Sequence, residues 1–141
     1  MPGERNEVRI QCSDEEEYGG QYKLWQANCR RSIKGAKGQQ ALRELRDALL
    51  ALPGKRLISG ALERDGEFCA IGAYAKAKGV DLTDFDPEDN NHDEAGIEAG
   101  MPHLVAWTVV FENDEAGPWS GETPEARYER MLRWVERCLA K

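Results

Sequence analysis

Apolar residues recur every three or four positions in two segments, and this spacing restricts the fold more than any other feature of the chain. In the first segment, residues 39–52, the repeating residues are Leu42, Leu45, Leu49 and Leu52. Pro53 and the glycine after it follow as a helix stop. The second segment, residues 124–140, is opened by Thr123 as N-cap and Pro124 at the first helical position. Two amphipathic helices of this kind favour a mainly α domain.

Weaker periodicity in the rest of the chain predicts shorter helices. The patterns place them at 21–33, 68–78, 93–100 and 102–113, with connections at 34–38, 82–91 and 113–121. The β-branched residues of 102–113 would also suit a strand, although we prefer a helix there. Asp65-Gly66 is typical of a two-residue turn and predicts a small β-hairpin near residues 56–69. We therefore expect a compact, mainly α, single-domain fold of about five helices.

The first twenty residues differ from the rest, because they are rich in acids and lack apolar periodicity. We expect residues 1–20 to form an acidic, flexible arm, with an edge strand at 7–12 as an alternative, and residues 21–141 to form the helical domain. The chain has no apolar run near the roughly 20 residues of a membrane span, and its start lacks the features of a secretory signal. These features predict a cytoplasmic protein without a membrane partner.

The cysteines and histidines indicate no site by their spacing. The four cysteines show no CxxC pair, and the chain holds only two histidines, so we expect no metal, no cofactor and no disulfide framework. Cys69 lies near the start of a predicted helix, where the dipole lowers the pKa of a thiol. With a histidine as base, Cys69 would act as the nucleophile of a hydrolase. Its apolar neighbours favour a buried structural thiol instead.

Charge is separated along the chain. Residues 23–56 carry a net charge of +7, whereas residues 81–122 carry −12 and no lysine or arginine, within an overall charge of −7. The two segments either neutralise each other in the monomer or form opposite faces. An acidic face would attract a basic protein partner and repel nucleic acid. The residues that we expect to bind protein are Asp84, Asp86, Glu88, Asp89 and Trp119.

A basic segment precedes the first strong helix, a geometry that can hold phosphate at the helix N-terminus. Its candidate anion-binding residues are Arg30, Arg31, Lys34 and Lys37. The segment lacks the P-loop pattern, so a solvated turn is the simpler interpretation. The same residues would contact nucleic-acid phosphates, but the overall acidity of the chain disfavours that partner.

The four tryptophans fall into two groups. Trp25, Trp107 and Trp134 lie on apolar helical stripes, which predicts that they pack in the core. Trp119 lies in a loop rich in glycine and proline, where it either folds back onto the core or is available to a partner.

Several short segments carry a likeness to other proteins. They are Arg31–Gly35 with Gly38 and Gln39, Lys55–Ile58, Asp65–Ala73, and Asn113–Glu115 before Thr123–Glu125. Over residues 25–139 the chain resembles a group of small phage and prophage proteins of unassigned function. The resemblance implies a phage or prophage setting and supplies no catalytic residues.

Three functions are compatible with these patterns. We expect a phage-encoded accessory protein that binds a host or phage protein, for example as an inhibitor of a host defence or nucleic-acid-binding factor. The first alternative is a small enzyme, either a Cys69-dependent hydrolase or a transferase that seats phosphate at residues 34–38. The second is an accessory protein that binds nucleic acid through its basic segment.

Overall fold

The structure of the protein is a computed structural model that describes residues 12–85, 91–118 and 121–140. In these residues the chain forms six α-helices, one 3-10 helix and one antiparallel pair of strands, which confirms the mainly α fold. Their order is α1 (Cys12–Lys34), α2 (Ala36–Ala51), β1 (Glu63–Arg64), β2 (Glu67–Phe68), α3 (Ala70–Ala77), η1 (Leu82–Asp84), α4 (Asp93–Glu98), α5 (His103–Asp114) and α6 (Pro124–Cys138). None of the helices in the described part is long and apolar enough to cross a membrane.

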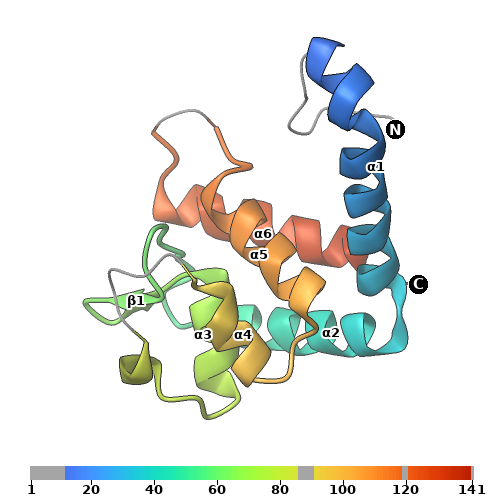
Figure 1. The fold of residues 1–141 in the computed structure, drawn as a ribbon. Helices are drawn as coiled ribbons and strands as arrows, with labels where there is room; N and C mark the ends of the chain where they lie inside the picture. Colours follow the sequence, from blue (N-terminus) through green and yellow to red (C-terminus); the bar gives the residue numbers. More distant parts are fainter. Residues whose placement is uncertain (1–11, 86–90, 119–120, 141) are drawn as a thin grey trace.

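The apolar stripes of the two strongest predicted helices, residues 39–52 and 124–140, meet in the core. Helix α2 packs against α1, α3 and α6, while α5 packs against α1, α3, α4 and α6. Figure 1 shows α1 along one side of the molecule, with its N-terminal end projecting past the other helices. Among the fully buried side chains are Leu42, Leu45 and Leu49 of α2, Ile71 and Tyr74 of α3, Val105 and Val109 of α5, and Met131 and Val135 of α6.

Helix α1 starts earlier than the sequence predicts. It begins at Cys12 rather than Gln21, so the second half of the expected arm is helical. Acidic residues are favourable near the positive N-terminal end of a helix, so the acid-rich composition of this part of the sequence also suits a helix start. Residues 1–11, which include most of the alternative edge strand, lie outside the described residues.

The connection predicted at 34–38 is in the right place but too long, because the break between α1 and α2 is the single residue Gly35. Gly38 is already inside α2, and its role is to let the two helices approach. A Cβ atom at Gly38 would overlap the carbonyl oxygen of Ser32 and lie 2.9 Å from that of Ile33. The glycine-rich composition therefore marks a tight corner rather than a loop.

Gln39 fastens this corner to the end of the chain. Its buried side-chain amide donates to the carbonyl oxygens of Ile33 (2.8 Å) and Cys138 (3.0 Å), and its Oε1 accepts from the N–H of Ala140 (2.7 Å). One side chain thus joins three helix ends, because α1 and α6 end at this corner and α2 begins there.

The predicted hairpin is present. Glu63 pairs with Phe68 and Arg64 with Glu67, and both turn residues, Asp65 and Gly66, have positive φ angles, as a type I′ turn requires. The hairpin leads directly into α3, whose start is held by α5.

Asn113 of α5 makes the hydrogen bonds that fix the start of α3. Its Oδ1 accepts from the N–H of Ala70 at 3.1 Å, and its Nδ2 donates to the carbonyl oxygen of Ile58 at 2.9 Å. Asn113 is fully buried, so these two hydrogen bonds satisfy main-chain groups that water does not reach.

Candidate binding groove

Helices α1 and α5 lie against each other and leave an open groove of about 530 Å³ between them, to which α6 also contributes. The groove-lining residues are Tyr22, Trp25, Gln26, Cys29, Arg30 and Ile33 from α1, Trp107, Thr108, Phe111 and Glu112 from α5 with Glu115 just after it, and Trp134 and Cys138 from α6. Most of these side chains are apolar or aromatic. A groove of this size and composition is typical of a ligand or peptide site.

Aromatic rings dominate the groove. The ring centroids of Trp25 and Trp107 are 5.3 Å apart with perpendicular planes, and Trp107 stacks on Phe111 at 5.5 Å with an interplanar angle of 8°. These are preferred geometries for aromatic pairs. Residues of α1 and α5 that are about 80 positions apart in sequence therefore build one aromatic surface.

The core-packing prediction is right for one tryptophan of this group and wrong for another. Trp134 is buried, with 8% of its surface exposed, whereas Trp107 is 39% exposed. Trp25 is half-buried. The helical spacing places all three on apolar faces, but the groove leaves part of the α1 and α5 faces open. An apolar face without a covering helix stays in contact with solvent.

The acids of the groove come from α5 and the residue after it. Burial raises the pKa of Glu112, and the charges of Arg130 and Arg137 only partly offset this effect. Glu115 lies at the C-terminal end of α5. Arg30 is the basic side chain that lines the α1 wall.

A smaller hollow of about 150 Å³ adjoins the groove. Asp93, Trp107, Val110, Phe111 and Glu115 line it, so three of its residues also line the groove. Two aromatic rings and two carboxyl groups thus line a space that is large enough for only a small chemical group.

The basic and acidic segments of the sequence are not joined by ion pairs in the described part of the chain. Arg56 of the basic segment pairs with Glu67 and Glu125. Within the acidic segment, Glu122 pairs with Arg130 of α6, whose Nε lies 2.7 Å from Oε2. This bond lowers the pKa of Glu122. Between described residues, direct ion pairs therefore do not link 23–56 to 81–122, although Arg30 lines the same groove as Glu112 and Glu115.

The four basic candidates do not converge on one cavity. Arg30 lines the groove, and Arg31, Lys34 and Lys37 are exposed around the corner at Gly35. Two amide groups of the corner are already used, because Gly35 donates to the carbonyl oxygen of Arg31 and Gln39 donates to that of Gly35.

Of the five residues expected to bind protein, only Asp84 is described, at the end of η1 and exposed. The other four, Asp86, Glu88, Asp89 and Trp119, lie outside the described residues.

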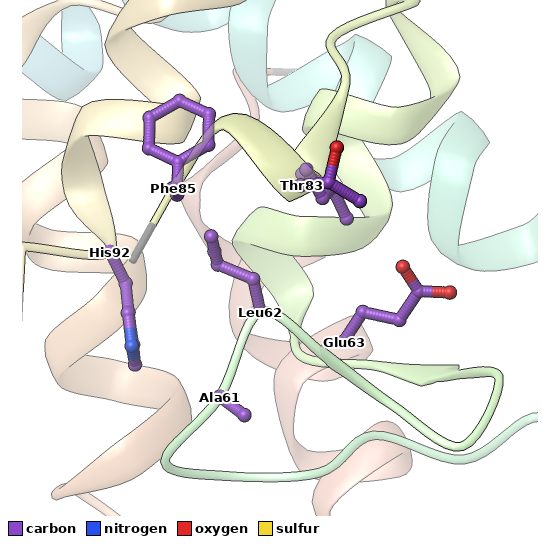
Figure 2. Close-up of a pocket in the computed structure, with 7 residues that line it drawn as sticks. Ala61, Leu62, Glu63, Thr83, Phe85 and His92 are labelled. Atoms are coloured by element: carbon purple, nitrogen blue, oxygen red, sulfur yellow. The ribbon is translucent and has the colours of Figure 1, made fainter. Parts of the chain in front are cut away.

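Another hollow, of about 320 Å³, lies beside η1 and shares no lining residue with the groove or with the smaller hollow. Its lining residues are Ala61, Leu62, Glu63, Leu82, Thr83, Phe85 and His92. In the view of Figure 2, Leu62 lies between His92 and Glu63, and the Glu63 carboxylate points away from the imidazole. The two titratable side chains are thus not arranged as a catalytic pair. Over the described ranges, no three potential metal ligands gather at one point.

Cys69 is the N-cap of α3, close to the predicted helix start. Its Sγ accepts from the N–H of Gly72 at 3.3 Å, and only 3% of the residue is exposed. Burial raises the pKa of its thiol to about 12. A nucleophilic cysteine needs a lowered pKa and access to substrate, so this environment favours the structural interpretation.

Thiol labelling tests this placement. We expect a short iodoacetamide pulse at neutral pH to leave Cys69 unmodified in the folded protein, because its thiol is buried and protonated. The same pulse in concentrated urea should label Cys69 fully, which serves as the control. Peptide mass spectrometry measures both. Labelling of Cys69 in the folded protein at the unfolded rate would contradict the structure.

The fold and the groove define a small helical domain with one open aromatic face. Comparison of the chain with protein-family models, curated proteins and solved structures gave no match.

Proposed function

We propose that this chain is a protein-binding domain, and that the groove between α1 and α5 receives a helical segment of a partner that carries apolar residues beside lysine or arginine. The observation that carries this proposal is the partly exposed aromatic cluster of Trp25, Trp107 and Phe111, flanked by the carboxyl groups of Glu112 and Glu115. Aromatic residues in a groove are typical anchors of protein interfaces.

The length of the groove suits a helix. On α1 its lining residues run from Tyr22 to Ile33, which corresponds to about 16 Å at 1.5 Å per residue. Three turns of a partner helix could therefore contact the groove with residues at spacings of three and four.

Charge favours a basic partner. Two carboxyl groups, those of Glu112 and Glu115, line the groove beside one guanidinium, that of Arg30, and burial raises the pKa of Glu112 because Arg130 and Arg137 offset the loss of water only in part. A lysine or arginine of the partner would supply that missing charge, whereas an acidic partner would be repelled by Glu112 and Glu115. Where a phage setting applies, as the sequence resemblance implies, the partner would be a host or phage protein.

A designed peptide tests this proposal without knowledge of the natural partner. The probe is a helical peptide of about 18 residues with leucine on one face and lysine beside it, and its affinity is measured by isothermal titration calorimetry. We expect saturable binding, and at least about tenfold weaker binding to Trp107→Ala, because Trp107 is a central anchor.

Two controls complete the experiment. Leu50→Ala truncates an exposed apolar residue of α2 that does not line the groove, and it should bind as the unmodified protein does. A peptide in which glutamate replaces every lysine should bind at least about tenfold more weakly. Equal affinity for both peptides, or for the Trp107 and Leu50 variants, would reject the proposal.

A second copy of the chain is the competing occupant. Light scattering gives the molar mass of the protein alone, and we expect the mass of one chain. A dimer that Trp107→Ala converts to a monomer would show that the groove is a self-association surface and would overturn the proposal.

A further inference from the structure

We propose that the smaller hollow, lined by Asp93, Trp107, Val110, Phe111 and Glu115, binds an organic cation of the alkylammonium class. The inference rests on the proposed function only for the source of the cation, which would be a lysine side chain of the partner. The hollow itself is defined by geometry that does not depend on the partner.

The size of the hollow selects a small group. Its volume of about 150 Å³ is well below the roughly 300–1,000 Å³ of sites for whole small molecules. An ammonium head with its attached carbons fits such a space, while a nucleotide or a sugar does not.

The walls of the hollow attract positive charge. Trp107 and Phe111 are stacked on successive turns of α5 and both line the space. Aromatic faces carry negative charge density and bind ammonium groups, most strongly when the ring is a tryptophan. Rings also favour an organic cation over a metal ion, which would have to give up tightly held water.

Two carboxyl groups add to this attraction, and no lysine or arginine lines the hollow. The side chain of Asp93 is mostly shielded from solvent, and the Nε2 atom of His103, whose imidazole is 67% exposed, lies 3.8 Å from Asp93 Oδ2. Glu115 lies at the C-terminal end of α5, where the helix dipole also favours a cation. The hollow therefore combines two carboxyl groups with two aromatic rings and one valine.

The test uses choline as the cation and 3,3-dimethyl-1-butanol as a neutral molecule of the same shape. Binding is followed in NMR spectra through the indole N–H signal of Trp107, assigned from the Trp107→Phe variant. We expect this signal to shift saturably with choline and to change little with the alcohol, because only the cation interacts with the rings and carboxyl groups by charge.

Neutral substitutions test the role of the acids. The double variant Asp93→Asn with Glu115→Gln keeps the shapes of both side chains and should bind choline about tenfold more weakly. The control is Glu94→Gln, which removes an exposed acid on the same helix as Asp93, α4, and should bind choline as the unmodified protein does. Equal shifts with choline and the alcohol, or unchanged choline binding by the double variant, would overturn the inference.

The two proposals fail separately. If the lysine peptide binds in the groove and choline does not bind, the cation site is wrong and the protein-binding function stands. If choline binds and the peptide does not, the hollow is a cation site and the proposed function is wrong.

Discussion

Replacing Gly38 by alanine is expected to destabilise the protein by about 3 kcal/mol or more, because the new methyl group overlaps backbone atoms that cannot move aside alone. The carbonyl oxygen of Ser32 lies where the Cβ would be, and that of Ile33 is 2.9 Å away. To admit the methyl group, the last turn of α1 must separate from the first turn of α2. That movement also breaks the hydrogen bonds of Gln39 to Ile33 and Cys138.

Urea unfolding followed by circular dichroism measures this loss. The matched control is Gly54→Ala, since Gly54 has only the Arg56 Cδ within reach, at 3.7 Å, and no positive φ angle. The control should change the free energy of unfolding by less than about 0.5 kcal/mol. If Gly38→Ala behaved as the control does, the close corner between α1 and α2 would be incorrect.

The second large effect is expected at Asn113. Asn113→Leu leaves the buried N–H of Ala70 and the buried carbonyl of Ile58 without partners, and each unsatisfied group costs about 1–3 kcal/mol. We therefore expect a total loss of about 2–6 kcal/mol in the free energy of unfolding. The loss should appear in the same urea titration.

Two further variants give this prediction its controls. Gln40→Ala removes an exposed side-chain amide that bonds only to Glu44 and Arg43, so its cost should stay below about 0.5 kcal/mol. Asn113→Asp keeps the acceptor for Ala70 but loses the donor to Ile58, and it also buries a charge, so it should be strongly destabilised too. A stable Asn113→Leu protein would show that Asn113 does not join α5 to α3.

The predicted helices were right where the apolar stripe was continuous. Helix α6 begins at Pro124 after the Thr123 cap, whose hydroxyl accepts from the N–H of Ala126, because capping is decided by adjacent residues. The corner at Gly35 was missed because two glycines suggest a loop when read locally. Only the approach of α1 to α2 shows that Gly38 is a packing residue.

The candidate site was largely missed. The acids expected to bind protein are mostly in residues that the structure does not describe, while the groove uses Glu112 and Glu115 from the same acidic segment. Trp107 and Phe111, four residues apart, gave the one usable signal, an aromatic pair on a helix face. That signal indicates an apolar face and does not tell whether another helix covers it.

The sequence by itself determined the elements of this protein: its helices with their caps and stripes, the hairpin turn at Asp65-Gly66, and the separation of charge along the chain. These depend on residues within a few positions of each other, so local physical chemistry is sufficient to predict them. Only the tertiary structure decided that Trp25 and Trp107 meet at a solvent-facing groove, whereas the burial of Cys69 was already favoured by its apolar neighbours in the sequence. Such features depend on how distant helices pack, and a helical stripe is the same whether its face is covered or open.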